Sequence, residues 1–208
     1  MSQTLVETPV PPAAQAFAIL RLAPAIEMTD DQFFALCQQN RDLRLERTAQ
    51  GDIIVMPPTG FETGNRNSEI TRQLVNWTKR DGTGVACDSS TGFKLPNGAD
   101  RSPDGAWISR ARLAPLTSEE KEKFLPLCPD FVIELRSPSD RLEDVQAKME
   151  EYIANGARLG WLIDPQTRRV HVYRPGAVEI LQGVQRVSGE GELPGFVLDL
   201  RDIWEPNV

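Results

Sequence analysis

The sequence predicts an α/β domain with a mixed β-sheet, and three observations lead to this prediction. Two nearly all-apolar runs, at 131–135 and 159–163, indicate strands that are covered on both faces. The segment between them, 142–155, has helical periodicity and is closed by a glycine, and a strand–helix–strand order implies a right-handed parallel crossover. Elsewhere, short alternating or β-branched segments separated by turn residues predict antiparallel hairpins. Parallel and antiparallel pairs together make the expected sheet mixed.

The remaining elements are predicted from local patterns in chain order. A first helix starts at an N-cap, Thr29 or Asp30, and a second is marked by Ile70, Leu74 and Trp77 at i, i+4 and i+7. The expected helices are about 30–40, 62–80 and a short one near 118–121. The expected strands are 43–47, 52–56, 85–87, 92–95, 104–108, 169–173 and 177–181, and the tail at 196–204 is expected to dock as a strand or helical turn.

Length and composition predict one domain preceded by a leader. A chain of 208 residues fits a single core. Residues 1–26 are rich in Pro, Ala and polar side chains and lack the features of a secretory signal, so we expect a disordered leader followed by a single domain at 27–208. No apolar run approaches the ~20 residues that span a bilayer. Cys37, Cys87 and Cys128 fit neither a metal-binding spacing nor a disulfide framework, which favours a reducing cytoplasm.

The net charge of −7 and the pI of about 4.9 lower the expectation of nucleic-acid binding. Broad non-specific affinity for nucleic acid requires a basic field. An acidic total does not exclude a local basic groove. A dimer that pools its basic side chains, or a divalent metal that neutralises carboxylates, would offset it.

Glu134 is the most informative single residue. It lies inside the apolar run 131–135, where an ionised carboxylate is costly unless it is paired, exposed at the strand end or bound to a metal. Pairing with an arginine such as Arg136 is the structural alternative. Burial raises the pKa of a carboxyl group, and perturbed carboxylates concentrate at functional sites.

Asp104 is the second candidate. It follows Pro103, which cannot donate in a central ladder, so Asp104 is expected at the margin of a strand. The alternative is a turn-forming aspartate, because Ser-Pro-Asp-Gly is good turn chemistry. Two carboxylates at the ends of adjacent strands, however, form a hard oxygen site of the kind that Mg²⁺ or Mn²⁺ prefers.

Lys148 is the third candidate, on the predicted helix 142–155. At about 100° per residue it lies roughly 40° beyond the Tyr152 edge of the apolar stripe of this helix. Its stem can therefore follow the sheet while its ammonium group reaches the strand end, although a surface lysine is the alternative. His171, the single histidine, alternates with valines in a hairpin strand and is interpreted as structural. With neither a Gly-x-Ser-x-Gly elbow nor a phosphate-binding Gly-Lys-Ser/Thr loop, the sequence disfavours a serine hydrolase and a nucleotide-binding enzyme.

Four stretches of the sequence share features with a known family. They are Ser102-Pro103-Asp104, the run PDFVIELRSPS at 129–139, the helix with Lys148, Met149 and Tyr152, and Gly160-Trp161-Leu162-Ile163-Asp164-Pro165. Together, from about residue 29 to 205, the chain resembles the Uma-type endonuclease family, which is common in cyanobacteria and belongs to the PD-(D/E)XK restriction-endonuclease superfamily. The resemblance implies a restriction-endonuclease-like fold, in which helices flank a mixed β-sheet core that carries extra β-hairpins.

The resemblance also implies a metal site. Asp104 and Glu134 would be its acidic ligands and the carbonyl of Leu135 a further one, with Mg²⁺ or Mn²⁺ as the cofactor. The lysine of the superfamily motif should stand two residues after the glutamate, where this chain has Arg136. An arginine stays protonated and accepts protons poorly. The resemblance implies that in this family the lysine stands on the following helix, which makes Lys148 the candidate, while Arg136 could clamp a phosphate or pair with the glutamate.

The superfamily often adds an acidic residue from an early helix. Glu69 is the match here, with a solvated helix surface as its alternative role.

These expectations combine into a Mg²⁺-dependent endonuclease that hydrolyses DNA, with a homodimer expected by analogy with the superfamily. The metal would polarise a phosphodiester and lower the pKa of a bound water, and Lys148 would orient or help to deprotonate that water. A catalytically silent binding or regulatory module with the same fold is the alternative, favoured by the acidic charge. Hydrolysis of another phosphate ester is a third possibility.

Overall fold

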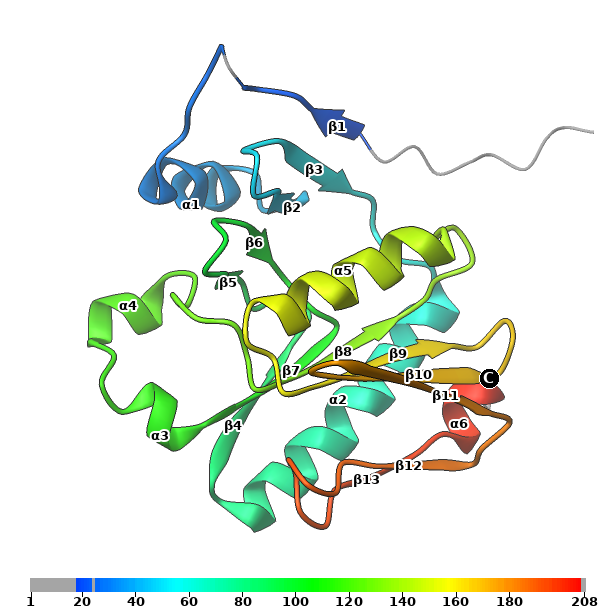
Figure 1. Cartoon of the computed structure of the whole chain (residues 1–208). Coiled ribbons are helices and arrows are strands. Elements are labelled where there is room, and N and C mark those ends of the chain that lie inside the picture. Colours follow the sequence, from blue (N-terminus) through cyan, green and yellow to red (C-terminus); the bar gives the residue numbers. More distant parts are fainter. Residues whose placement is uncertain (1–17, 24, 207–208) are drawn as a thin grey trace, which may run out of the picture.

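A six-stranded mixed β-sheet forms the centre of the computed structural model, which describes residues 18–23 and 25–206 (Figure 1). The strand order is β11-β10-β9-β8-β7-β4. The strands are β4 (Gly84–Asp88), β7 (Gly105–Ser109), β8 (Phe131–Leu135), β9 (Leu159–Asp164), β10 (Arg169–Arg174) and β11 (Ala177–Gln182). Strands β8 and β9 are parallel and the other neighbours antiparallel, which confirms the predicted mixed sheet and its fold class.

Helices cover both faces of this sheet. Helix α5 (Leu142–Ala154) is the crossover between β8 and β9, and its Met149 and Tyr152 are buried on one face. Helix α2 (Phe61–Asp81) packs on the other face through Ile70, Leu74 and Trp77. Both β8 and β9 are buried along their whole length, as their apolar sequences predict for strands with two covered faces.

One glycine allows the edge strand β4 to pack closely on its neighbour. Gly84 lies under the indole ring of Trp107 in β7, and a Cβ atom there would stand 2.2 Å from Trp107 Cε2. A larger side chain therefore has no space at this position.

A second sheet, formed mostly by the N-terminal part of the chain, lies beside α5 (Figure 1). Its order is β1-β3-β2-β6-β5. The strands are β1 (Ala18–Leu20), β2 (Arg44–Arg47), β3 (Ile53–Met56), β5 (Phe93–Lys94) and β6 (Asp100–Arg101). Helix α1 (Asp30–Gln39) precedes the hairpin β2–β3, and Thr29 and Gln32 cap its start reciprocally. Pairing of β2 with β6, at Arg47 and Asp100, connects this sheet to the chain that leads into β7.

Strand β1 lies within the segment 1–26, which the sequence predicts as a disordered leader. Ala18–Leu20 pair with β3, so this boundary is corrected, because Ala-Ile-Leu can extend the hairpin edge with backbone hydrogen bonds. The rest of the predicted leader up to residue 17, together with residue 24, lies outside the described residues.

The remaining helices and strands are short. They are α3 (Arg110–Leu113), α4 (Ser118–Glu122), β12 (Arg186–Ser188), β13 (Val197–Asp199) and α6 (Arg201–Trp204). The tail thus forms both a strand and a helical turn, and Phe196 and Ile203 join the core beneath α2. Within 18–23 and 25–206, no helix combines the length and apolar character needed to cross a membrane.

Candidate active site

Asp104 lies at the margin of β7, next to β8. The antiparallel register places Gly105 opposite Ile133, so Asp104 faces the end of β8. Its Oδ2 accepts the backbone N–H of Leu135 at 2.9 Å, and its Oδ1 accepts Asn67 Nδ2 at 3.1 Å. The guanidinium of Arg44 stands 3.6 Å from the same Oδ1. These contacts fix a buried carboxylate between β8, α2 and β2.

Glu134 lies in β8 with its carboxylate in contact with two side chains of α5. Lys148 Nζ stands 2.9 Å from Glu134 Oε1, and the hydroxyl of Tyr152 donates to the same oxygen at 3.0 Å. Lys148 and Tyr152 are four residues apart and so share one face of the helix. The three side chains therefore meet, and Glu134 pairs with this lysine rather than with Arg136.

Lys148 bridges two carboxylates. Its Nζ lies 2.9 Å from Glu134 Oε1 and 2.9 Å from Glu46 Oε1. Burial opposes the charged ammonium form, but these two carboxylates outweigh it and raise the pKa of Lys148. With a side chain that is only 16% exposed, Lys148 is a half-buried, protonated residue and not a solvated surface lysine.

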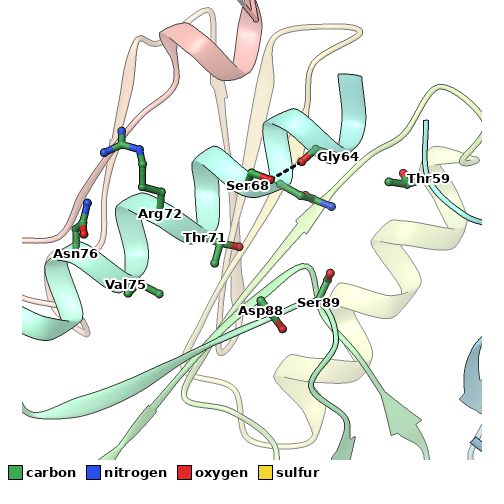
Figure 2. Close-up of a pocket in the computed structure, with 10 residues that line it drawn as sticks. Thr59, Gly64, Ser68, Thr71, Arg72, Val75, Asn76, Asp88 and Ser89 are labelled. Carbon is green, nitrogen blue, oxygen red and sulfur yellow. Dashed lines mark hydrogen bonds between the residues drawn. The ribbon is translucent and has the colours of Figure 1, made fainter. Parts of the chain in front are cut away.

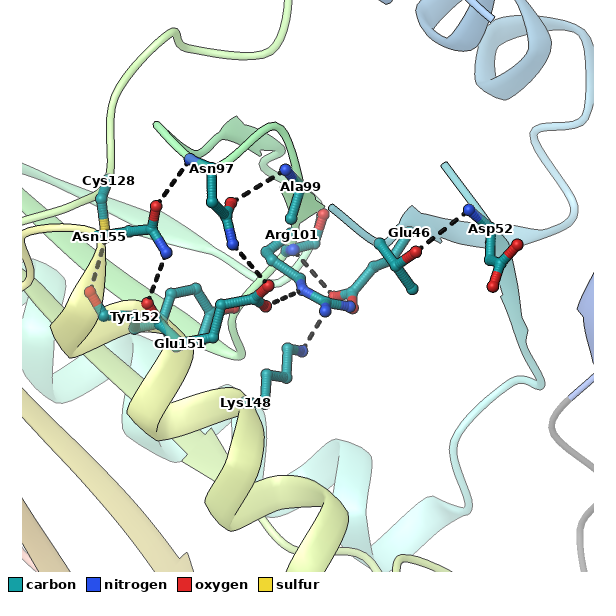
Figure 3. A network of polar contacts seen from close by, with 12 residues as sticks. Glu46, Asp52, Asn97, Ala99, Arg101, Cys128, Lys148, Glu151, Tyr152 and Asn155 are labelled. Carbon is teal, nitrogen blue, oxygen red and sulfur yellow. Dashed lines mark hydrogen bonds and ion pairs between the residues drawn. The ribbon is translucent and has the colours of Figure 1, made fainter. Parts of the chain in front are cut away.

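Glu46, in β2, is a member of the site that sequence reasoning missed. Figure 3 shows it among Arg101, Lys148 and Glu151. Its carboxylate accepts the backbone N–H of Ser102 at 2.9 Å and pairs with Arg101 at 3.1 Å. Burial opposes ionisation of Glu46, yet Lys148 and Arg101 lower its pKa to about 2. The ionised form of Glu46 is therefore favoured, and it anchors the ammonium of Lys148.

The electrostatics of Glu134 differ from those of Glu46. Burial is the largest cause that raises the pKa of Glu134, to about 7. Lys148 opposes this effect, while the carboxylates of Asp104 and Glu46 add to it. Since Glu134 shares the lysine with Glu46, its own negative charge is under-compensated. A carboxylate in this state is a good ligand for an added cation.

Two expected accessory residues lie elsewhere. Glu69 forms an ion pair with Arg72 at 2.5 Å and accepts from Gln73 at 2.8 Å, on the flank of α2 that faces the C-terminal segment. Arg136 pairs with Asp164 at 3.0 Å, where it ties the ends of β8 and β9 together. Neither geometry supports a role in the site.

Asn67 is the residue of α2 that contacts Asp104. It is two residues from Glu69, which is about 200° around the helix. A neutral amide carries no signal of this kind in a single sequence, so only the fold reveals it. His171 is buried in β10, as expected for a structural residue.

The donor set fits a hard divalent cation. Within the described ranges, no group of three or more Asp, Glu, His or Cys side chains is arranged to hold a metal ion. The carboxylates that bind a metal here would therefore be those of Asp104 and Glu134 alone. Asn67 Oδ1 is a buried amide oxygen that has no hydrogen-bond partner among these residues, and it lies beside Asp104. Two carboxylates with neutral oxygens match Mg²⁺ or Mn²⁺, which keep positions open for water and phosphate.

Comparisons with known proteins identify the family and a structure of similar fold. A crystal structure from Anabaena variabilis, described as a putative nuclease belonging to DUF820, is 21% identical in sequence and superimposes with a TM-score of 0.70. The match covers 86% of this chain and 98% of that one. Curated proteins give no significant match. The family model described as "Uma2: Putative restriction endonuclease" matches residues 30–201. This match spans most of the chain, and the protein therefore belongs to the Uma2 family of putative restriction endonucleases.

Proposed function

We propose that this protein is a Mg²⁺- or Mn²⁺-dependent endonuclease that hydrolyses phosphodiester bonds of DNA. The observation that supports this most strongly is the contact of Lys148 with Glu134 beside Asp104, at the ends of two adjacent strands. Membership of the Uma2 family supports the nuclease reaction. The carboxylates of Asp104 and Glu134, with the carbonyl of Leu135, would hold the metal.

Each residue of the candidate site has a separate role in this proposal. When bound, the metal supplies a Lewis acid that polarises the phosphodiester and lowers the pKa of a bound water. Lys148 remains protonated beside Glu134, so it can orient the attacking water and balance the negative charge that develops on the phosphate. Glu46 holds the ammonium of Lys148 in place and acts as a positioning residue.

A cleavage assay tests the proposal. Purified protein is incubated with Mg²⁺ or Mn²⁺ and with either supercoiled plasmid or circular single-stranded DNA, and nicked and linear products are measured. We expect cleavage that is abolished in Glu134→Ala and Asp104→Asn. Glu179→Gln is the matched control, because Glu179 is an exposed acid on edge strand β11 and should cleave like the wild type. Equal cleavage by the wild type and Glu134→Ala would disprove the proposal.

A catalytically silent binding or regulatory module is the second candidate, and the net charge of −7 favours it. Calorimetric titration with Mn²⁺ separates the two functions. Metal binding that disappears in Asp104→Asn supports the enzyme, whereas the absence of metal binding supports the module. Other phosphate esters, offered in the same cleavage assay, test for a different hydrolase. Sedimentation of the purified protein tests the homodimer that we propose by analogy.

A further inference from the structure

A groove runs along α2 and opens onto the candidate active site. It has a volume of about 520 Å³. Helix α2 forms one wall, and Asp88 and Ser89, at the end of β4, form the other (Figure 2). Asn67 lines the groove and also donates to Asp104 at 3.1 Å. A ligand that fills the groove therefore ends beside Asp104.

Most of the residues that line the groove carry hydroxyl or amide side chains, and the charged ones are one arginine and one aspartate. The lining consists of Thr59, Gly64, Asn67, Ser68, Thr71, Arg72, Val75, Asn76, Asp88 and Ser89. The charge of Arg72 is already balanced by Glu69 at 2.5 Å. Hydroxyl and amide groups of this kind form many of the hydrogen bonds that proteins make to phosphate and sugar oxygens.

Two further features extend the groove along the same face of α2. At about 100° per residue, Phe61, Gly64, Ser68 and Lys79 fall within an arc of roughly 60°. Phe61 is 77% exposed at the start of the helix, so its aromatic ring is not packed in the core. Lys79 and Arg80 are exposed near the end of the helix. Within the described residues, neither side chain forms an ion pair. The face thus has an aromatic end, a polar middle and a basic end, over about 27 Å.

We propose that this face of α2 binds a single strand of DNA, an inference that rests on the proposed nuclease function. Exposed aromatic rings stack on unpaired bases, and lysine or arginine neutralises phosphates. A base within a duplex is already stacked and is not available to Phe61. The volume of about 520 Å³ also lies in the range of small-ligand pockets, so the groove accommodates a few groups of one strand. The strand passes Asn67, which brings a phosphate to Asp104.

Fluorescence anisotropy tests this assignment without any cleavage. A labelled 20-nucleotide strand and a duplex of the same sequence are titrated with the protein in EDTA and at low salt. Phe61→Ala removes the stacking ring, and its dissociation constant for the strand should rise about tenfold. Val178→Ala is the matched control, because Val178 is 54% exposed on the distant edge strand β11. This control should bind the strand like the wild type.

Salt dependence tests the basic end. Loss of two phosphate contacts in Lys79→Gln/Arg80→Gln should reduce the slope of log K against log [salt] by about 1.4. Lys121→Gln, an exposed lysine on α4, is the control and should leave the slope unchanged. Thermal melts of all variants show whether each one is folded.

The outcomes separate this proposal from the nuclease function. If the wild type fails to bind the strand, binds the duplex as tightly, or binds the strand unchanged after Phe61→Ala, the assignment of the groove is wrong, even if the plasmid is cleaved. If the strand binds through Phe61 and Lys79 but no metal supports cleavage, the groove assignment is supported and the nuclease function fails.

Discussion

Replacing the buried carboxylate of Glu134 with an amide should stabilise the metal-free protein above neutral pH. Glu134 is 6% exposed, and burial together with neighbouring carboxylates raises its pKa from 4.5 to about 7. The folded state therefore holds a proton that the unfolded state releases. The contribution of the Glu134 carboxyl group to the free energy of unfolding is fully present below pH 4.5 and is lost as the pH rises through 7. Glu134→Gln keeps the shape of the side chain and removes this titration.

The size of the effect follows from the pKa values. One pKa unit corresponds to about 1.4 kcal/mol, so the change from 4.5 to about 7 amounts to about 3 kcal/mol. At pH 8.5 we expect Glu134→Gln to be more stable than the wild type by up to this amount. For a chain of 208 residues this corresponds to a midpoint of thermal unfolding that is higher by about 6–12 °C. Below pH 4.5 the two proteins should converge.

Urea unfolding in EDTA, repeated at several pH values between 4.5 and 8.5, measures this difference. The same series with Mn²⁺ provides a second readout, because a metal that binds the folded state stabilises the wild type but not Glu134→Gln. The reasoning is refuted if Glu134→Gln is less stable than the wild type at pH 8.5 in EDTA. It is also refuted if the difference between the two does not change with pH.

Three further substitutions have defined outcomes. Glu46→Gln should lower the rate of cleavage about a hundredfold by releasing the ammonium of Lys148, while the calorimetric affinity for Mn²⁺ stays unchanged. A parallel loss of cleavage and of Mn²⁺ affinity would contradict a positioning role. Arg136→Ala should cost about 3 kcal/mol in urea unfolding, because the fully buried Asp164 loses its cation, while cleavage at low temperature persists. Gly84→Ala should cost about 2 kcal/mol, since its methyl group collides with Trp107; an unchanged midpoint would show that the ring moves freely.

The central sheet and two of the catalytic candidates could be predicted from the sequence because their signals are local. The apolar runs around Glu134 and Trp161 identify buried strands, and a charge inside such a run demands a partner. Lys148 lies at the edge of an apolar stripe, so helix geometry permits its ammonium to reach the strand end, and the family resemblance selects it among the lysines. Each of these inferences uses a window shorter than about 20 residues.

Glu46 and Asn67 could not be found in this way. In the sequence, Glu46 alternates with Leu45 as an exposed strand residue would. Its burial results from the pairing of β2 with β6, and the two strands are more than 50 residues apart in the chain. The family resemblance points to Glu69 as the acidic residue of the early helix, yet the rotation of α2 against the sheet turns Asn67 toward Asp104 instead. Strand docking and helix rotation are tertiary properties that no local pattern encodes.

The contact between Glu46 and Lys148 also has a consequence during protein synthesis. These residues are 102 positions apart, so at 5–20 residues per second the ribosome adds the lysine roughly 5–20 s after the glutamate. A nascent or truncated chain that ends before α5 contains every acidic member of the site but lacks Lys148, the cation that contacts Glu134. Such a chain leaves Glu134 without its charge partner, and completion of the site waits for the translation of α5.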